Sequence, residues 1–321
     1  MIKQSLIYII IFSLSILSVF SQKNGIYKSL EKAFENPNDV IELKLPRNSL
    51  NSLDERIGNL INLEVLILRE NQLTKLPKGL CKLTKLKKLD LSRNKLTAFG
   101  DEMKNLKNLQ YLNLSFNSLK EFPNIIFEFD NLNHLELHKT GISTIPNDIE
   151  NLQNLYYLDL SFNNLKIIQE SIFKLKNLRF LGFNNNDLTF IPKSISKLKN
   201  LKELWLLRNN LITYPEEINT LSLIKLYLTG NNLSEIPNSI SKISTLEELG
   251  LMKNNLTDLP HDFQKLENLK VLTLNDNCFK KIPTVLRKLK KLKYIHLRNN
   301  PITQLEITNF EKNTNIKIFS K

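Results

Sequence analysis

Cysteine is nearly absent from this chain of 321 residues, which contains only Cys81 and Cys278. Two cysteines cannot form a disulfide framework, so the fold has to be stabilised by apolar burial, for which 41% hydrophobic residues suffice. Glycine is scarce too: the 8 glycines are scattered, and no glycine-rich loop that could cradle phosphates is present. The cysteines and the 4 histidines form no nucleophile–base set. We therefore expect a protein that is not an enzyme and that uses no cofactor.

Long apolar runs are missing after the first twenty residues. The early run, Leu6 to Phe20, follows the positive charge of Lys3 and ends in Val19-Phe20-Ser21, which is typical of an export signal. The alternative is a retained anchor, but a spanning helix needs about 20 apolar residues and this run is shorter. The sequence predicts a signal peptide over residues 1–21 and a secreted mature chain, extracellular or periplasmic, without a membrane span.

A repeat of fixed period dominates the rest of the chain. The stretch Leu63 to Lys85, LEVLILRENQLTKLPKGLCKLTK, begins again at Leu86 and at Leu109, in steps of 23. A fixed period of this size indicates a stacked array of similar units. The repeats start at Val40, Leu63, Leu86, Leu109, Leu132, Leu155, Leu178, Leu201, Leu223, Leu246 and Leu269, with a truncated one from Leu292. The step from Leu201 to Leu223 is 22, so we expect one residue to be missing in the loop before Leu223.

The repeated pattern L-x-x-L-x-L-x-x-N-x-L, followed by L-P-x-x-I-x-x-L-x-x, resembles the leucine-rich repeat family. The resemblance implies an α/β fold, a right-handed β/α superhelix shaped like a horseshoe. Its concave side is a parallel β-sheet of about 12 strands, and short helical or 3₁₀ turns lie on the convex side. Eleven full repeats and one partial repeat span residues 40–305.

Segments outside the repeats are predicted to cap the two ends of the array, where a terminal repeat has no neighbour to cover its apolar face. Residues 22–39 form the N-terminal cap, with a short helix over Ser29 to Asn36 in which Ser29 is the N-cap. Residues 306–321 form the C-terminal cap, with a helix over Ile307 to Asn313 and a last edge strand over Asn315 to Phe319.

Alternation in the LxxLxL segment predicts which side chains face inward. Counting from the first leucine of each repeat, positions four and six point to the core and positions three, five, seven and eight face the concave side. Position nine should form a buried amide ladder, because an asparagine side chain both donates and accepts. Its members are Asn48, Asn71, Asn94, Asn117, Asn163, Asn186, Asn209, Asn231, Asn254, Asn277 and Asn300, with Thr140 as the exception, where the ladder should be weaker. Phe99-Gly100 and Ile168-Gln169 replace the Leu-Pro step in two repeats, where we expect local loop differences.

Aromatic side chains concentrate at the concave positions of the middle repeats. A contiguous exposed aromatic patch on a rigid sheet indicates an interaction site. The alternative is that cross-strand rings only stabilise the sheet. The candidate partner-binding residues are Tyr111, His134, Glu136, His138, Tyr157, Asp159, Phe180, Trp205, Leu207 and Tyr227.

Two histidines of one repeat face the same side as a glutamate, in the order His134, Glu136, His138. The histidines lie about 13 Å apart along an extended strand, too far to share one metal ion. We therefore predict no metal site, and a pH-sensitive contact or plain polar surface are the remaining alternatives.

Net charge is +13, which raises nucleic acid or an acidic surface as partners. The concave positions carry ten cations and eight anions, so most of the excess charge lies on the convex side and in loops. A phosphate-tracking groove concentrates positive charge where it binds, and we therefore expect no nucleic-acid partner. The convex lysines either form a solvated face or hold the protein loosely to an anionic cell surface.

These features predict a secreted, non-catalytic binding protein that recognises a protein or peptide on its concave face. A glycan-binding or cell-surface adhesion protein is the alternative, because rings flanked by Asp, Glu and Asn also suit sugars.

Overall fold

The computed structural model describes residues 25–319, and these form one parallel sheet in which every strand pairs with its sequence neighbours. The predicted signal peptide lies outside the described residues. Twelve strands come from the repeats and one from each cap. The strands are β1 Ile26–Tyr27, β2 Glu42–Lys44, β3 Val65–Ile67, β4 Lys88–Asp90, β5 Tyr111–Asn113, β6 His134–Glu136, β7 Tyr157–Asp159, β8 Phe180–Gly182, β9 Glu203–Trp205, β10 Lys225–Tyr227, β11 Glu248–Gly250, β12 Val271–Thr273, β13 Tyr294–His296 and β14 Lys317–Phe319.

A 3₁₀ turn follows each full repeat strand on the opposite side of the coil. Proline is the N-cap residue of most of these turns, where its fixed φ suits the extended conformation that precedes the turn and it has no N–H of its own to satisfy. The repeat turns are η2 Glu55–Asn59, η3 Lys78–Lys82, η4 Asp101–Asn105, η5 Asn124–Glu128, η6 Asn147–Asn151, η7 Glu170–Lys174, η8 Lys193–Lys197, η9 Glu216–Thr220, η10 Asn238–Lys242, η11 His261–Lys265 and η12 Thr284–Lys288. A further short turn, η1 Pro37–Asp39, lies in the N-terminal cap before β2.

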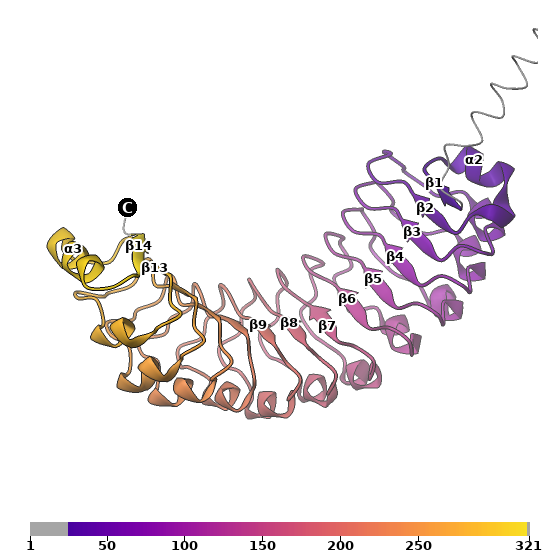
Figure 1. The fold of residues 1–321 in the computed structure, drawn as a ribbon. Helices are drawn as coiled ribbons and strands as arrows, with labels where there is room; N and C mark the ends of the chain where they lie inside the picture. Colours follow the sequence, from indigo (N-terminus) through magenta and orange to yellow (C-terminus); the bar gives the residue numbers. More distant parts are fainter. Residues whose placement is uncertain (1–24, 320–321) are drawn as a thin grey trace, which may run out of the picture.

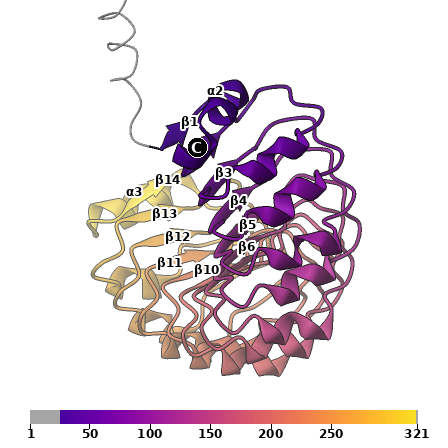
Figure 2. The ribbon, with the colours of Figure 1, turned by 90° about the vertical axis from the view of Figure 1, so that its right-hand side faces the viewer.

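The stacked coils bend into an arc, with the strands lining the inner curve and the 3₁₀ turns the outer one (Figure 1). Turning the molecule by 90° shows the strands side by side along the hollow and the turns stacked on the outside (Figure 2). Because the strands on the inner side are closer together than the turns on the outer side, the sheet becomes a continuous concave surface. This surface holds the side chains of positions three and five of each repeat.

Each end of the arc carries a short α-helix. Helix α2 (Leu30–Glu35) begins at Ser29, whose hydroxyl accepts the N–H of Lys32. Helix α3 (Gln304–Lys312) buries Ile307 and Phe310 against the last coil and is followed by the edge strand β14. Both helices place apolar side chains on a terminal coil that has no further repeat beside it.

Leucine and isoleucine fill the interior of every coil. Position-four leucines from Leu43 to Leu272 are at most 1% exposed, and their neighbours at position six are equally buried. Burying one such side chain stabilises the fold by about 1.5–3 kcal/mol relative to exposure. The two strand faces therefore differ as the alternation predicts, with Leu158 and Leu206 fully buried beneath Tyr157 and Trp205.

The 22-residue step is accommodated between η9 and β10, as predicted. In the preceding coil, the residue that ends the turn, Leu198, has φ −81° and ψ 62°. Leu221, which ends η9, is instead extended at φ −96° and ψ 157°. Straightening one residue lets a shorter connection reach the same strand register, so β10 pairs normally with β9 and β11.

The predicted loop differences at Phe99-Gly100 and Ile168-Gln169 are wrong. Turns η4 and η7 have the same length as the other repeat turns, and Gly100 and Gln169 adopt the extended conformation that proline adopts elsewhere. Any residue can take this φ and ψ, so proline favours the turn without being required for it.

A left-handed backbone residue recurs at position eight of the repeats. Non-glycine residues hold φ between 51° and 59° there, and Gly230 occupies the same position in one coil. Left-handed backbone costs a non-glycine residue roughly 1–2 kcal/mol, which the surrounding hydrogen bonds have to offset. The bend turns the chain sharply away from the strand and projects the position-eight side chains at the edge of the concave surface.

Among residues 25–319, none of the helices has both the length and the apolar character that crossing a bilayer requires.

Candidate functional site

Six rings from six consecutive strands form a continuous row on the concave surface, which we call the aromatic strip. Its members, from β5 to β10, are Tyr111, His134, Tyr157, Phe180, Trp205 and Tyr227. The first four rings stack face to face, with successive centroids 4.5, 4.0 and 4.1 Å apart. The last two meet their neighbours edge-on, at 5.1 and 5.5 Å. Five of the six predicted rings are half-buried on the surface, and each ring of the strip contacts the rings of the adjacent strands.

The row changes position along the sheet, and a glycine makes the change possible. Tyr157 and Phe180 are at position three, whereas Trp205 is at position five of the next coil. Gly182 lies between them at position five, and a Cβ there would come within 3.1 Å of the Phe180 ring and 2.8 Å of an Asp159 oxygen. The ring of Phe180 leans over this space and is only 8% exposed. Phe180 is therefore a supporting member of the strip, which corrects its prediction as an exposed contact.

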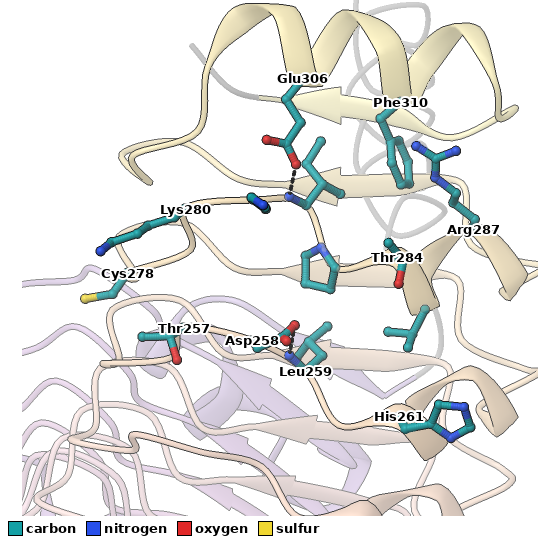
Figure 3. A pocket seen from close by; sticks show the side chains of 14 residues that line it. Thr257, Asp258, Leu259, His261, Cys278, Lys280, Thr284, Arg287, Glu306 and Phe310 are labelled. Atoms are coloured by element: carbon teal, nitrogen blue, oxygen red, sulfur yellow. Dashed lines mark hydrogen bonds between the residues drawn. The ribbon is translucent and has the colours of Figure 1, made fainter.

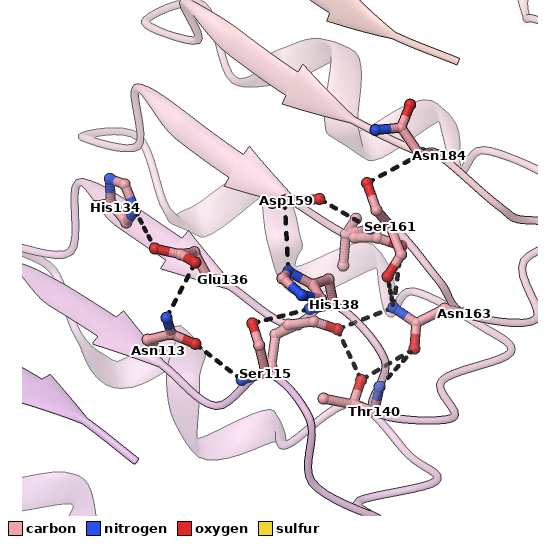
Figure 4. A network of polar contacts seen from close by, with 12 residues as sticks. Asn113, Ser115, His134, Glu136, His138, Thr140, Asp159, Ser161, Asn163 and Asn184 are labelled. Carbon is pink, nitrogen blue, oxygen red and sulfur yellow. Dashed lines mark hydrogen bonds and ion pairs between the residues drawn. The ribbon is translucent and has the colours of Figure 1, made fainter. Parts of the chain in front are cut away.

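A carboxylate beside the strip connects three of its polar groups. The Tyr111 hydroxyl lies 2.8 Å from Glu136 Oε1. His134 Nε2 lies at the same distance from this oxygen, and the Asn113 amide donates to Oε2 at 3.0 Å (Figure 4). Lys88 lies 4.2 Å above the Tyr111 ring and closes this end of the stack. Glu136 therefore fixes the orientation of two rings and is not free to move.

Charge and burial act against each other on this network. Burial by itself would raise the pKa of Glu136, but the hydrogen bonds from His134 and Tyr111 outweigh it and hold the pKa below its ordinary value. Burial, together with the nearby Glu136 carboxylate, raises the pKa of the Tyr111 hydroxyl well above its usual range. The tyrosine accordingly stays a neutral donor and the glutamate a charged acceptor at neutral pH.

The second histidine belongs to a separate pair. His138 Nδ1 lies 3.6 Å from an Asp159 oxygen, and Asp159 in turn accepts the N–H of Ser161 (Figure 4). The two histidines thus contact different carboxylates. Across the described chain, no group of three or more His, Cys, Asp or Glu side chains has the arrangement of a metal site.

Two of the predicted residues, Leu207 and Tyr227, lie at the far end of the strip. Leu207 is half-buried at position seven of its coil, where its N–H bonds the Asn184 side chain at 2.9 Å. Tyr227 donates its hydroxyl to Glu248 on the next strand. Burial and this bond to Glu248 raise the pKa of the Tyr227 hydroxyl. Both ends of the strip are therefore tied by a tyrosine–glutamate bond to the neighbouring coil.

Position-nine asparagines bind the backbone of two coils at once. The Asn71 amide donates to the carbonyls of Leu45 and Leu68, each at 2.8 Å. Its oxygen accepts the N–H groups of Asn48 and Leu50, each at 3.0 Å. The same bonds to the preceding coil recur at Asn94, Asn117, Asn163, Asn186, Asn209, Asn231, Asn254, Asn277 and Asn300.

The first member of the row differs from the prediction of a buried ladder. Asn48 is exposed and donates only to the nearby carbonyl of Pro46. It lies in the first repeat, where no full coil precedes it, so the partner carbonyl used by the later asparagines does not exist.

The exception at Thr140 reorganises one coil. The Thr140 hydroxyl bonds the carbonyl of Leu137 in its own coil, and the Thr140 carbonyl accepts the N–H of Lys120. Lys120 and Gly141 adopt left-handed φ values of 64° and 83°. A hollow of about 460 Å³ opens here at the edge of the concave surface, lined by Phe116, Asn117, Ser118, Lys120, Lys139, Thr140, Gly141 and Phe162.

Sequence reasoning missed a second row of asparagines on the other side of the coils. These residues immediately precede the first leucine of a repeat, and each donates to a carbonyl 24 residues earlier, as Asn62 does to Asn38 at 2.8 Å. The recurring Asn-Leu pairs at the repeat starts could have predicted this row from the sequence. The other members are Asn108, Asn131, Asn154, Asn177, Asn200 and Asn268.

Solved structures similar to this one are leucine-rich repeat proteins. A leucine-rich repeat protein of Leptospira interrogans is 27% identical with a TM-score of 0.68, covering 92% of this chain and 99% of its own. An internalin of Listeria monocytogenes is 22% identical with a TM-score of 0.71, covering 89% of this chain and 88% of its own, and shares the fold.

A plant receptor is similar over part of its length. The ectodomain of the Arabidopsis thaliana membrane receptor kinase GASSHO1/SCHENGEN3, solved in complex with CASPARIAN STRIP INTEGRITY FACTOR 2, is 25% identical with a TM-score of 0.65. The match covers 88% of this chain and 41% of the receptor chain, so this protein spans less than half of that ectodomain.

Sequence comparison with family models gives the same result. The model described as leucine-rich repeat region matches residues 126–225, and that described as leucine rich repeat matches residues 61–119 and 244–302. A third leucine-rich repeat model matches residues 222–243. No curated protein matches the sequence at a significant level. With the solenoid and its asparagine ladder, these matches identify the chain as a leucine-rich repeat protein.

Proposed function

We propose that this chain is a secreted, non-catalytic binding protein that recognises a protein or peptide along the aromatic strip. The observation that carries the proposal is the strip itself, six rings in contact across β5 to β10 on the hollow side of a rigid sheet. Rigid aromatic side chains supply binding energy at low entropic cost, since they are already ordered before the partner arrives.

The orientation of the rings favours a peptide over a sugar. The faces of His134 and Tyr157 are covered by neighbouring rings at about 4 Å, so their edges and not their faces point to the hollow. A sugar binds aromatic residues by lying flat on a ring face, and the faces of these stacked rings are already occupied. Ring edges and the polar groups of His138 and Asp159 suit the side chains and amides of an extended peptide.

The neighbouring hollow offers a second anchoring point for the same partner. Phe162, which lines this hollow, is 49% exposed. Arg93 lies 4.0 Å above the ring of Phe116, which also lines it. His138 contacts Phe116 at a centroid distance of 4.6 Å and so connects the hollow to the polar groups beside the strip. A peptide crossing the strip could place an apolar side chain between the two phenylalanines.

Similar solved structures support the class of function and not the ligand. The Arabidopsis receptor ectodomain was solved in complex with a separate molecule, CASPARIAN STRIP INTEGRITY FACTOR 2. Transferred to this chain, such a role requires export, which the signal predicted over residues 1–21 would provide.

A displayed library of random peptides and a glycan array, both screened with the full mature chain, test this proposal. We expect the selected peptides to bind the native protein and to lose at least about tenfold in affinity to Tyr157→Ala combined with Trp205→Ala. Phe190→Ala is the matched control, because this exposed ring lies outside the strip.

Thermal melting of each variant shows whether the fold is intact. Peptides that bind the native and double-variant proteins equally would remove the aromatic strip as the binding site. Selective binding on the glycan array, lost in the same double variant, would replace the peptide by a sugar.

A further inference from the structure

Positive charge gathers at the C-terminal end of the array. Residues 269–319 contain eleven Lys and Arg against three Asp and Glu, a net charge of +8, whereas residues 25–268 carry only +2. The excess is densest between residues 280 and 293, a segment without a single acidic side chain. We call its seven exposed cations the C-terminal basic band: Lys280, Lys281, Arg287, Lys288, Lys290, Lys291 and Lys293.

Some earlier coils pair a lysine with a carboxylate of the neighbouring coil, and this coil does not. Because equivalent positions of adjacent coils lie side by side, Lys87 pairs with Glu64 at 2.8 Å and Lys270 pairs with Glu247 at 2.7 Å, each across one repeat. The same register places Lys293 beside Lys270 and Lys288 beside Lys265. Within the described residues, none of the seven band cations forms an ion pair with a carboxylate. A coil that stacks like charges gains nothing in stability from them.

The band surrounds the coil instead of covering one face. Lys280 and Lys281 lie in the connection from β12 to η12, Arg287 and Lys288 lie in η12, and the last three cations lie in the return to β13. Strand and turn are on opposite sides of the coil, so the two connections form its opposite edges. A flat membrane could contact only part of such a band, whereas a flexible polymer can follow it.

One part of the band lines a hollow beneath the C-terminal cap. The hollow measures about 660 Å³ and is open between the last two coils and helix α3 (Figure 3). Lys280, Lys281 and Arg287 line it, with Arg287 lying 5.3 Å from the centre of the Phe310 ring. The two carboxylates in the wall are already engaged, since Asp258 accepts the N–H of Leu259 and Glu306 that of Ile282.

We propose that the C-terminal basic band binds a polysaccharide that carries sulfate or phosphate esters. Closely spaced anionic groups match cations that have no carboxylate partner on three sides of a coil, and releasing their counterions drives such binding. Nucleic acid fits less well, because the nearest exposed rings, Tyr294 and Phe319, lie on strands β13 and β14 and not among the band cations, so bases that stack on them would not follow the band. This surface is distinct from the aromatic strip, so the proposal stands or falls independently of the proposed function.

The test measures binding of the full mature chain to immobilised heparin and to neutral dextran at several salt concentrations. The band variant combines Lys280→Gln, Lys281→Gln and Lys288→Gln, and leaves Arg287 in place because it packs on Phe310. The matched control combines Lys75→Gln, Lys104→Gln and Lys197→Gln, three exposed lysines of other coils, and has the same net charge.

We expect salt-sensitive binding to heparin, none to dextran, and a loss of at least about tenfold in the band variant, with less than about twofold in the control. Equal losses in the two variants would mean that total charge alone is responsible and would overturn the proposal, as would no binding to heparin. Vesicles of anionic lipid and a DNA duplex are the competing probes. Tighter binding to either, lost in the band variant, would assign the band to that ligand instead.

The Tyr157→Ala and Trp205→Ala double variant should bind heparin like the native protein, which separates this result from the test of the aromatic strip.

Discussion

Single asparagine side chains satisfy the backbone at most corners where a strand ends. Asn163 shows how much one side chain can do, because its oxygen accepts the N–H groups of Thr140, Gly141 and Ile142 while its amide donates to two carbonyls. Without it, several buried polar groups would lose their partners at once, and each such loss costs about 1–3 kcal/mol. Neighbouring acidic residues on the concave surface have fewer bonds and more contact with water.

Asn163→Ala should therefore destabilise the protein more than Asp159→Ala. We expect a loss of about 3 kcal/mol or more for the asparagine and about 1 kcal/mol for the aspartate, which accepts one backbone N–H and faces His138. Urea unfolding followed by circular dichroism measures both. Equal shifts of the midpoint would contradict the assignment of Asn163 to the buried ladder and of Asp159 to the concave surface.

Glu136 makes the stability of the strip depend on pH. Its pKa is lower in the folded chain than in the unfolded chain, so its contribution is fully present above the unfolded value of about 4.3. The contribution disappears as the pH falls through the folded pKa, because protonation removes the charge that His134 and Tyr111 contact. Unfolding midpoints of the native protein and Glu136→Gln should differ at neutral pH and converge as the pH falls below the folded pKa of Glu136.

Glu121→Gln provides the control, since this side chain is exposed outside the network. A difference between the native protein and Glu136→Gln that stays constant with pH would remove Glu136 as the source of the effect.

Each coil is a repeated element with two hydrogen-bonded corners, one after the strand and one before it. The row of asparagines that precedes the strands holds the second corner, with amide–carbonyl distances such as 2.9 Å between Asn200 and Lys176. The row is interrupted at several repeat starts, and before Leu223 the 22-residue step leaves Ser222 in the connection. The coil keeps its strand register nevertheless, because Leu221 is extended.

Inserting an asparagine between Ser222 and Leu223 should restore the 23-residue step and stabilise the array. The new amide would reach the carbonyl of Lys199 as its equivalents do in other coils, which is worth about 0.5–1.5 kcal/mol. An alanine inserted at the same place is the control for length alone. Unfolding midpoints in urea distinguish the two, and an asparagine insertion no better than the alanine insertion would show that this corner is not stabilised by the amide.

The whole molecule is an elongated arc in which each coil contacts only its neighbours, so distance along the sequence becomes distance in space. Cys81 lies in η3 and Cys278 follows β12, nine strands farther along the sheet. At about 4.8 Å for each strand, the two are about 40 Å apart. The two candidate binding surfaces are separated in the same way, with the aromatic strip in the middle of the arc and the C-terminal basic band at one end.

Oxidation should accordingly give no intramolecular disulfide, because a bridge needs Cα atoms within about 7 Å. Mild oxidation of the purified chain followed by non-reducing electrophoresis and mass spectrometry checks this. We expect intact monomer and, through the exposed Cys278, some disulfide-bonded dimer. A peptide containing both Cys81 and Cys278 from a monomer band would contradict the arc.

Periodicity made most of this architecture predictable. The leucines at positions four and six, the parallel sheet and the 3₁₀ turns all follow from a pattern that repeats one local environment many times. The candidate site was predictable only as a set of positions. That Tyr111, His134 and Tyr157 would contact one another follows from register, but their stacking, and the burial of Phe180, depend on side-chain rotamers.

The sequence alone determined which residues turn inward and which are left on the hollow surface, because strand alternation and the 23-residue period allow one arrangement that buries the leucines of positions four and six in each repeat. Only the tertiary structure decided what those surface residues do to one another. Their partners lie one coil away, and whether a ring stacks, a carboxylate is bound or a lysine stays unpaired depends on neighbours that are distant in sequence. Glu136 becomes a fixed hydrogen-bond acceptor and Lys293 an unpaired charge for that reason.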